Sequence, residues 1–508
     1  MDPVTSAEPS TAAVPVTSAE PSTAARPVAT EQAVRPGYRW RWPALLVILG
    51  VEVMDLLDSL VTVIAGPSVV RDLGGGDTTI QWLTAGYAVA MAAGLLVGGR
   101  LGDRYGRRRV FLVGMGGFVL ASGLCAAALS PGMLLATRVA QGLLGALMLP
   151  QGLGMIRAMF PPTQMATAFG AFGPIMGVSS VGGPVLAGWL IDADLLGLGW
   201  RAVFAVNLPI GLLALLAGLR LLPADTPDRR VGLDPAGALM AAAGMAGLVF
   251  ALIEGRGYGW PPWCVALILA ALALVVTFAI HQARRDARGR PTVVVPSVFG
   301  KRAFTGGLLV GLTLFAAISA LSLVLTLYLQ LGLGYTPTRA GLAGMPMAVG
   351  MVAGFGVAAG LQQRLGRTLM HVGLAVAAVG LLGLGAVAAA GSAAASAGAV
   401  AAWLGLAGVG TGMTMSPFFD LALSGVDDHE SGSASGALTS IQQVGGAVGV
   451  ASVGTLFLGR VEGLPVDRLG GFGQAAQASF AAAAALLALT WLLAFLLPRR
   501  SAHPLSGH

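Results

Sequence analysis

Long apolar runs dominate this sequence and constrain its fold more than any other feature. They recur from Trp42 onward, and each is bounded by a cluster of Gly, Pro or Arg. About 20 apolar residues suffice for a helix to cross a bilayer. Of the 508 residues, 56% are hydrophobic and 10% are charged, whereas a soluble fold carries about 25% charged residues. The sequence therefore predicts an all-α polytopic membrane protein, and it excludes a soluble, disordered, fibrous or disulfide-rich chain.

Fourteen of these runs are long enough to span a membrane. The expected helices cover residues 43–66, 80–101, 109–129, 132–156, 165–191, 202–222, 233–254, 263–281, 304–330, 339–362, 367–390, 397–425, 433–458 and 475–497.

The first 40 residues differ in composition from the rest. Pro3–Ala13 recurs almost unchanged as Pro15–Ala25, and the segment is rich in Pro, Ser, Thr and Ala. A segment with so few large apolar side chains cannot bury a core, so we expect residues 1–40 to form a disordered cytoplasmic tail. The tail also lacks the order of features that marks a signal peptide.

The basic residues predict the orientation of the helices. Lys301 is the only lysine, and the formal net charge is +7. Basic residues in short loops are retained on the cytoplasmic side. With the amino terminus inside, inner segments hold twenty-three of the 30 basic residues, outer loops hold six, and Arg138 lies within a helix. We therefore expect both termini to be cytoplasmic, and we interpret the charge as membrane topology rather than nucleic-acid binding.

An internal repeat divides the chain. Leu101–Arg107 (LGDRYGR) follows the second run and Leu361–Arg367 (LQQRLGR) follows the tenth. This match pairs the first six helices with the last six as parallel halves, which is a transporter architecture. The expected segments are the tail 1–40, a six-helix half 41–222, two inserted helices with a linker 223–303, a second six-helix half 304–497, and a cytoplasmic tail 498–508.

Ionisable residues inside the apolar runs are functional candidates, because lipid solvates no charge. Glu52, Asp55 and Asp58 fall within one stripe of about 120° on the first helix. Arg138 lies in the fourth helix, and Asp420 lies near the cytoplasmic end of the twelfth. A desolvated carboxyl can bind and release a proton near neutral pH, and Asp58 is the leading candidate for that role. The alternative is that these acids only pair with Arg138 or cap backbone groups.

Two glycine-rich segments are expected to bring helices close together. Gly98–Arg109 joins the second and third helices, and its Asp103 can bind an arginine or a helix amino terminus. Gly182–Gly188 in the fifth helix supplies a bend and a flat packing face.

Other chemistries have little support in the sequence. Gly300-Lys301 is followed by Arg302 and lacks the upstream glycine of a nucleotide-binding loop. Cys125 and Cys264 have no metal-ligand spacing and lie in separate apolar runs. Asp427–Glu430 (DDHE) is interpreted as a solvated turn rather than a metal site. We therefore expect no enzyme activity, no cofactor and no metal.

In this order, these residues resemble the major facilitator superfamily, and specifically its 14-helix drug:proton antiporters. The resemblance extends from about residue 43 to residue 497. It rests on Leu57-Asp58, Ala65 and Pro67; Trp82, Ala85 and Tyr87; Gly99–Arg109; Arg138–Gly142 and Pro150; Gly183-Pro184 with Gly188; and Trp200–Gly211.

The resemblance implies alternating access by two six-helix halves, with proton entry driving export of amphipathic or cationic drugs and antibiotics across the bacterial cytoplasmic membrane. Asp58 is similar to the helix-1 acid that couples protons, and Arg138 to the helix-4 arginine linked to proton transfer. The residues that resemble the conformational switch loop are Gly99, Asp103, Arg104, Gly106 and Arg107, and those that resemble the antiporter motif are Gly183, Pro184 and Gly188.

Two other functions stay open. One is uptake or exchange of a physiological metabolite on the same fold, and the other is a non-transporting membrane sensor or enzyme. Leu60 and Val63 stand where the resembled family usually has Thr and Asn, so a relative's substrate does not transfer directly. The expected partners are small hydrophobic or cationic compounds, protons and the lipid bilayer, with the chain acting as a monomer and binding no nucleic acid.

Overall fold

The computed structural model describes residues 38–76, 78–161, 164, 168, 172–225, 227–390, 397–426, 430–462 and 469–500, and these residues form helices and connecting loops without a strand. The helices of the first part of the chain are α1 (Arg41–Leu73), α2 (Thr78–Tyr105), α3 (Arg107–Ala126), α4 (Pro131–Met159), α6 (Phe172–Asp192), α7 (Ala202–Ala205) and α8 (Asn207–Leu221). They are followed by α9 (Pro235–Glu254) and α10 (Pro262–Asp286). The remaining helices are α11 (Arg302–Leu327), α12 (Pro337–Leu365), α13 (Arg367–Ala389), α14 (Ala397–Ala422), α15 (Ser431–Val461) and α16 (Leu469–Leu493).

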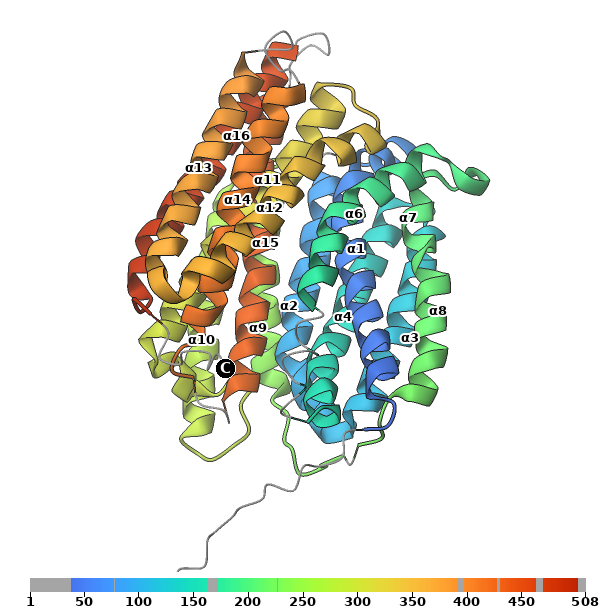
Figure 1. Cartoon of the computed structure of the whole chain (residues 1–508), viewed down its shortest axis with the longest axis vertical. Helices are drawn as coiled ribbons and strands as arrows, with labels where there is room; N and C mark the ends of the chain where they lie inside the picture. Colours follow the sequence, from blue (N-terminus) through green and yellow to red (C-terminus); the bar gives the residue numbers. More distant parts are fainter. Residues whose placement is uncertain are drawn as a thin grey trace, which may run out of the picture. The chain divides into compact units, whose positions relative to one another are not determined.

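The long helices form two groups that lie side by side. In the first group α1 packs on α6 and α8, α2 on α4, and α3 on α4 and α8. In the second group α14 packs on α12 and α13, and α11 packs on α15 and α16. Figure 1 shows the blue-to-green group beside the yellow-to-red group. The two groups meet where α2 packs on α15 and where α6 packs on α12.

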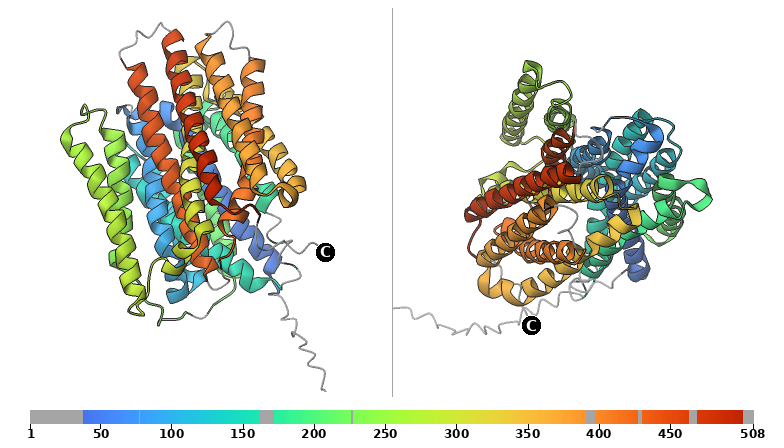
Figure 2. Two further views of the ribbon diagram at one scale, coloured as in Figure 1. Left: turned by 90° about the vertical axis from the view of Figure 1, so that its left-hand side faces the viewer. Right: turned by 90° about the horizontal axis from the view of Figure 1, so that it is seen from above.

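The helices α9 and α10 form an antiparallel pair at the margin of the bundle (Figure 2). Of the pair, α9 packs against α2 of the first group and α15 of the second. Most of α10 is not covered by protein, since only 11% of its most apolar stretch is buried. Such exposure of an apolar helix is expected where lipid rather than water surrounds it.

The fold class predicted from the sequence is confirmed, but the count of fourteen spans is not. Twelve of the described helical segments are long and apolar enough to cross a membrane. The two remaining long helices are α1, which carries Glu52, Asp55 and Asp58, and α6. For α6 the description begins at Phe172, so part of the expected span 165–191 lies outside the described residues. Most of the expected tail 1–40 also lies outside them, and the expected segment boundaries stay predictions.

The start of several helices is visible in the sequence. Pro131 follows the N-cap Ser130, whose hydroxyl accepts a hydrogen bond from the Met133 N–H at 3.2 Å. Asp234 caps α9 in the same way, with the Gly237 N–H as donor at 3.1 Å. Proline suits this position because the first turn has no partner for its missing N–H. A polar cap followed by proline therefore fixes where these helices begin.

The repeated loop turns at a glycine with positive φ in both groups of helices. Between α2 and α3 the chain turns at Gly106, whose φ is 97°, and between α12 and α13 it turns at Gly366, whose φ is 50°. A positive φ strains residues that carry a Cβ, so glycine suits both positions. The next helices begin at Arg107 and Arg367. The sequence match thus extends to a positive-φ glycine before the next helix, whereas ψ differs, at 126° for Gly106 and −125° for Gly366.

Candidate functional site

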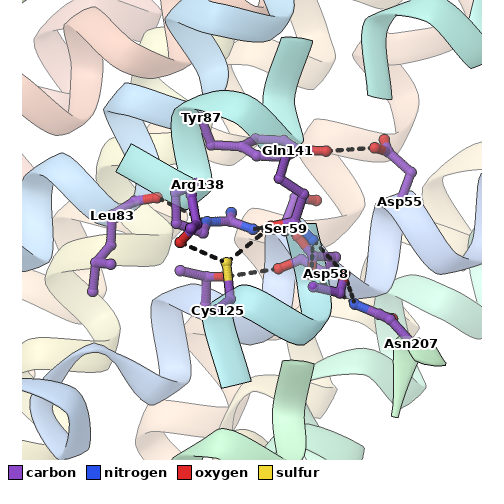
Figure 3. Close-up of polar contacts among 12 residues, drawn as sticks. Asp55, Asp58, Ser59, Leu83, Tyr87, Cys125, Arg138, Gln141 and Asn207 are labelled. Carbon is purple, nitrogen blue, oxygen red and sulfur yellow. Dashed lines mark hydrogen bonds and ion pairs between the residues drawn. The ribbon is translucent and has the colours of Figure 1, made fainter. Parts of the chain in front are cut away.

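A buried ion pair joins α1 to α4 within the first group of helices. Arg138 Nη1 binds Asp58 Oδ2, and both side chains are about 1% exposed. Figure 3 shows the two side chains directed toward each other. A charge is rare in a membrane helix unless a partner neutralises it. The pair places Asp58 and Arg138, which the sequence singled out separately, at one point of the fold.

Neutral polar side chains complete a cluster around this pair. Asp58 Oδ1 accepts hydrogen bonds from Gln141 Nε2 at 3.0 Å and from Asn207 Nδ2 at 2.8 Å. Gln141 also donates to Ser122 Oγ at 2.8 Å and accepts from Arg138 Nη1 at 2.6 Å. We call these five residues the Asp58 cluster; α1, α3, α4 and α8 each contribute to it.

Three members of the Asp58 cluster were not predicted as site residues, although Gln141 and Asn207 lie within the segments Arg138–Gly142 and Trp200–Gly211 that carry the family resemblance. Gln141 lies three residues after Arg138, on the same face of α4, and Asn207 is the first residue of α8. An isolated amide in an apolar helix is the signal that could have found them. Ser122 gives no such signal, because single hydroxyl residues are common in these helices.

Tyr87 of α2 links Arg138 to Asp55, the second buried aspartate of α1. The Tyr87 hydroxyl on α2 donates a hydrogen bond to Asp55 Oδ1. The guanidinium carbon of Arg138 lies 4.2 Å from the centre of the Tyr87 ring. This distance suits a cation–π contact. Tyr87 therefore contacts both groups, its ring the Arg138 guanidinium and its hydroxyl Asp55, while Asp58 binds the guanidinium directly (Figure 3).

Glu52 differs from the other two acids of α1. Its side chain is half-buried, whereas Asp55 and Asp58 are buried. No described residue forms a hydrogen bond or ion pair with Glu52, while both aspartates have such partners. Glu52 is therefore the acid of α1 for which the described residues provide no binding partner.

Asp420 lies apart from these acids. It is half-buried on α14, and its Oδ2 accepts a hydrogen bond from Gln362 Nε2 of α12 at 3.1 Å. Gln362 in turn accepts from Ser416 Oγ at 2.6 Å. Asp420 thus differs from Asp58 of the other helix group. It lies near a helix end, and it has no arginine partner among the described residues.

The segment expected to join the second and third helices is mostly helical, because Asp103 and Arg104 lie in the last turn of α2 and only Gly106 separates α2 from α3. This segment, which we call the Asp103 loop, forms a network with the residues between α8 and α9. Asp103 binds Arg107 one turn later at 3.0 Å, and the Asp103 carbonyl accepts from the Asp228 N–H at 3.0 Å. Arg104 Nη1 donates to the Val231 carbonyl at 3.1 Å. Gly99 lies in the last part of α2, beside Pro150 of α4. These contacts hold the loop, and its role as a switch stays a prediction.

The glycines and proline of α6 lie where the two helix groups meet. A Cβ on Gly188 would lie 2.4 Å from the Pro337 carbonyl oxygen of α12. A Cβ on Gly341 of α12 would lie 2.4 Å from the Pro184 carbonyl oxygen of α6. Gly183, beside Pro184, is buried. Small residues on both helices therefore allow the two backbones to touch.

Among the described residues, no group of three or more His, Cys, Asp and Glu side chains is placed to hold a metal ion. Of the Asp427–Glu430 segment only Glu430 is described, and it binds Lys301 and Ser297.

The sequence matches the family model named Major Facilitator Superfamily over residues 47–450. A probable actinorhodin transporter of Streptomyces coelicolor is 47% identical over 84% of this chain and 74% of its own length. A puromycin resistance protein of Streptomyces alboniger is 38% identical over 82% of each chain. A tetracenomycin C resistance and export protein of Streptomyces glaucescens is 34% identical over 84% of this chain and 78% of its own.

A solved structure supports the fold. A bacterial homologue of the human lysosomal transporter Spinster, in an inward-facing and unoccupied conformation, aligns with a TM-score of 0.63. The alignment covers 92% of this chain and 100% of that one, at 16% identity.

Proposed function

The chain belongs to the major facilitator superfamily of membrane transporters, and we propose that it is a proton-coupled antiporter that exports amphipathic or cationic antibiotics. Three relatives are named for transport of, export of or resistance to antibiotics. The observation that carries the proton coupling is the buried pair of Asp58 and Arg138, with both oxygens of the acid occupied.

The proposed orientation places both termini and the Asp103 loop on the cytoplasmic side of a bacterial inner membrane. The directions of the helices agree with one end of the bundle being outside and the other being cytoplasmic. Arg201 pairs with Asp72 and Arg256 pairs with Glu462 at the ends of helices that the charge rule places outside. The pair of Asp103 and Arg107 lies at the opposite end of α2. Inner loops rich in arginine favour that end as cytoplasmic.

In this proposal Asp58 exchanges the proton. Arg138 keeps its charge at every physiological pH, so a proton on Asp58 leaves a buried guanidinium without its counter-charge. Breaking a buried pair in this way costs several kcal/mol. Asp55 accepts a hydrogen bond from the Tyr87 hydroxyl and is thus the second carboxylate linked to Arg138 through Tyr87. We propose that Arg138 moves toward Asp55 when Asp58 binds a proton, and returns when the proton leaves.

Substrate enters this cycle through competition with the proton. Binding of a compound from the cytoplasm favours the ionised form of Asp58. Binding of a proton from outside favours the state from which the compound has been released. One proton that moves down a 100 mV potential supplies about 2.3 kcal/mol. When ionised, the half-buried Glu52, six residues before Asp58 on α1, attracts the positive charge of cationic substrates. Uncharged compounds do not depend on it.

A vesicle experiment tests the proposal. Wild-type protein and the variant Asp58→Asn are reconstituted, and a panel of cationic and uncharged antibiotics is assayed in two modes. The wild type is expected to concentrate a compound when a pH gradient is imposed. Asp58→Asn is expected to keep exchange of labelled for unlabelled compound and to lose the gradient-driven mode.

The control is Asp420→Asn, an acid in a helix far from the Asp58 cluster. It is expected to behave as wild type in both modes. Gradient-driven accumulation by Asp58→Asn at the wild-type level would show that another group carries the proton. Exchange of a metabolite without any antibiotic transport would instead support a physiological exchanger.

A further inference from the structure

A basic pocket lies between α9 and α10, at the end of the bundle that the proposed orientation places in the cytoplasm. Its volume is about 260 Å³. The pocket begins beside Met240 of α9 and continues around the last turns of α10 into the following loop. It is lined by Met240, Thr277, Ile280, His281, Arg284, Arg285, Arg288 and Arg290. No carboxylate lines it.

The inner wall of the basic pocket is rigid. Arg285 Nε donates to the Pro291 carbonyl at 2.8 Å and lies 3.5 Å from Asp234 Oδ2. His281 Nε2 lies 3.1 Å from Asp234 Oδ1. The Asp234 carboxylate is buried and also accepts from Gln282 Nε2 at 2.7 Å. Asp234 therefore binds the residues of the inner wall and does not neutralise the exposed arginines at the opening of the pocket.

The outer wall of the basic pocket carries positive charge without a counter-charge. Arg284, Arg288 and Arg290 are exposed. In the part of the chain that the structure describes, none of the three forms an ion pair with a carboxylate. Arginine binds phosphate oxygens through two parallel N–H donors. Three such side chains around one small pocket suit a phosphate group.

An apolar strip leads away from the basic pocket along α10. It consists of Leu269, Leu272, Val276 and Ile280, which recur at helical spacing on one face. Leu269 is 61% exposed and Val276 is 58% exposed, so protein does not cover the strip. The strip rises about 16 Å from Ile280 to Leu269, which is a large part of the thickness of one leaflet.

We propose that the basic pocket binds the phosphate headgroup of an anionic phospholipid, whose acyl chains lie on the apolar strip. Basic pockets between membrane helices on the cytoplasmic side are suited to such headgroups. The continuous strip favours a lipid over free phosphate, which has no apolar part to bury. The proposed orientation determines only which leaflet, the cytoplasmic one, supplies the lipid. Lipid binding is a function for α9 and α10, which have no part in the proposed transport cycle.

Native mass spectrometry of the full-length protein in detergent tests the site. The protein is first stripped of lipid and then titrated with cardiolipin, phosphatidylglycerol or phosphatidylcholine. The site variant is the triple substitution Arg284→Gln, Arg288→Gln and Arg290→Gln. The matched control is Arg364→Gln, Arg499→Gln and Arg500→Gln, which removes three exposed arginines from the same end of the bundle.

The site variant is expected to bind the first cardiolipin or phosphatidylglycerol at least tenfold more weakly than wild type. The control is expected to stay within twofold of wild type, and phosphatidylcholine should bind all three proteins equally weakly. Excess inorganic phosphate should not displace the lipid. Equal losses in the two triple variants would overturn the proposal, because lipid would then follow total charge. Complete displacement of lipid by phosphate would overturn the lipid as the ligand.

Discussion

Both carboxylate oxygens of Asp58 are occupied, Oδ2 by Arg138 and Oδ1 by Gln141 and Asn207. The cluster lies within one group of helices, so it does not by itself tie the two groups together. A proton that binds either oxygen of Asp58 must displace at least one of these donors.

Removal of Arg138 tests the strength of the pair. Arg138→Met leaves Asp58 buried without a counter-charge, which is expected to destabilise the protein by about 3–5 kcal/mol. The double variant Arg138→Met with Asp58→Leu removes both charges and is expected to recover most of that loss. Thermal unfolding of the purified variants measures both effects. If the single variant is as stable as wild type, the two groups do not depend on each other.

Asp234 gives a pH-dependent prediction outside the membrane. Burial opposes its ionisation, but hydrogen bonds from His281, the Gly237 N–H and Gln282 outweigh burial and lower the pKa of Asp234. A lowered pKa stabilises the fold above the unfolded value of about 3.9, and this stabilisation is lost as pH falls through the folded value. Asp234→Asn is thus expected to lower the unfolding temperature at pH 7.

The difference between wild type and Asp234→Asn is expected to shrink as pH falls below about 4. Unfolding curves at a series of pH values measure it, with Asp286→Asn as the control on the same hairpin. If the difference in unfolding temperature stays constant over this range, Asp234 stabilises the fold by packing and hydrogen bonding rather than by its charge.

The sequence predicted the charged members of the site and offered pairing with Arg138 as an alternative, but it did not identify which acid pairs. Asp58 and Arg138 are conspicuous because each is a charge in an apolar run. Which acid of α1 meets Arg138 depends on how α1, α3, α4 and α8 pack together. Helix periodicity alone places Glu52, Asp55 and Asp58 on one stripe and does not distinguish among them. Only the fold shows that Asp58 binds Arg138, Asp55 binds Tyr87 and Glu52 is left without a partner among the described residues.

At the scale of elements, the contact of α6 with α12 depends on small residues on both sides. Gly188 and Gly341 each face a backbone carbonyl of the other helix. The Thr338 N–H of α12 also donates to Asp192 Oδ2 at the end of α6, at 2.9 Å. This contact lies at the end of the bundle opposite the Asp103 loop. Alternating access requires such a contact to open and close.

A larger residue at Gly188 should hold this contact open. Gly188→Leu is expected to push α12 away, because a Cβ already overlaps the Pro337 carbonyl. Gly182→Leu is the matched control, since nothing lies within 4 Å of a Cβ there. The readout is the rate of disulfide formation between Cys residues introduced at Asp192 and Thr338, together with the rate of transport.

The prediction is that Gly188→Leu slows both the cross-link and transport at least tenfold, whereas Gly182→Leu changes neither more than twofold. Equal cross-linking in both variants would mean that α6 and α12 do not approach through Gly188.

Helix boundaries were predictable only where local chemistry marks them. The polar caps before Pro131 and Pro235 fix two starts. The expected span 202–222 agrees with one candidate span, Gly199–Leu221, in which α7 and α8 join at Val206 with helical dihedral angles (φ −60°, ψ −27°). Pro209 lacks an N–H, so it cannot donate to the Ala205 carbonyl one turn earlier. Hydropathy alone does not detect this missing hydrogen bond, because the residues on both sides of it are equally apolar.

At the scale of the whole molecule, the alternation of helix direction sorts the loops onto two ends. Leu196, between α6 and α7, is 96% exposed and is expected to face outside. Arg229, between α8 and α9, is exposed and is expected to face the cytoplasm. The native Cys125 and Cys264 are buried, so they should not react.

A cysteine at Leu196 is therefore expected to react with a membrane-impermeant thiol reagent in intact cells. A cysteine at Arg229 should react only after the cells are permeabilised, and wild type is the control. Labelling of Arg229→Cys in intact cells would reverse the orientation and place the basic pocket in the outer leaflet.

The most direct test of the central claim is substrate-induced proton release from purified protein in weakly buffered solution. A compound that favours ionised Asp58 should release protons from the wild type when it binds. Asp58→Asn should bind the same compound and release none. Proton release by Asp58→Asn equal to that of the wild type would contradict the assignment of Asp58. Proton coupling itself would be contradicted if the compound binds the wild type without proton release at any pH between about 6 and 8.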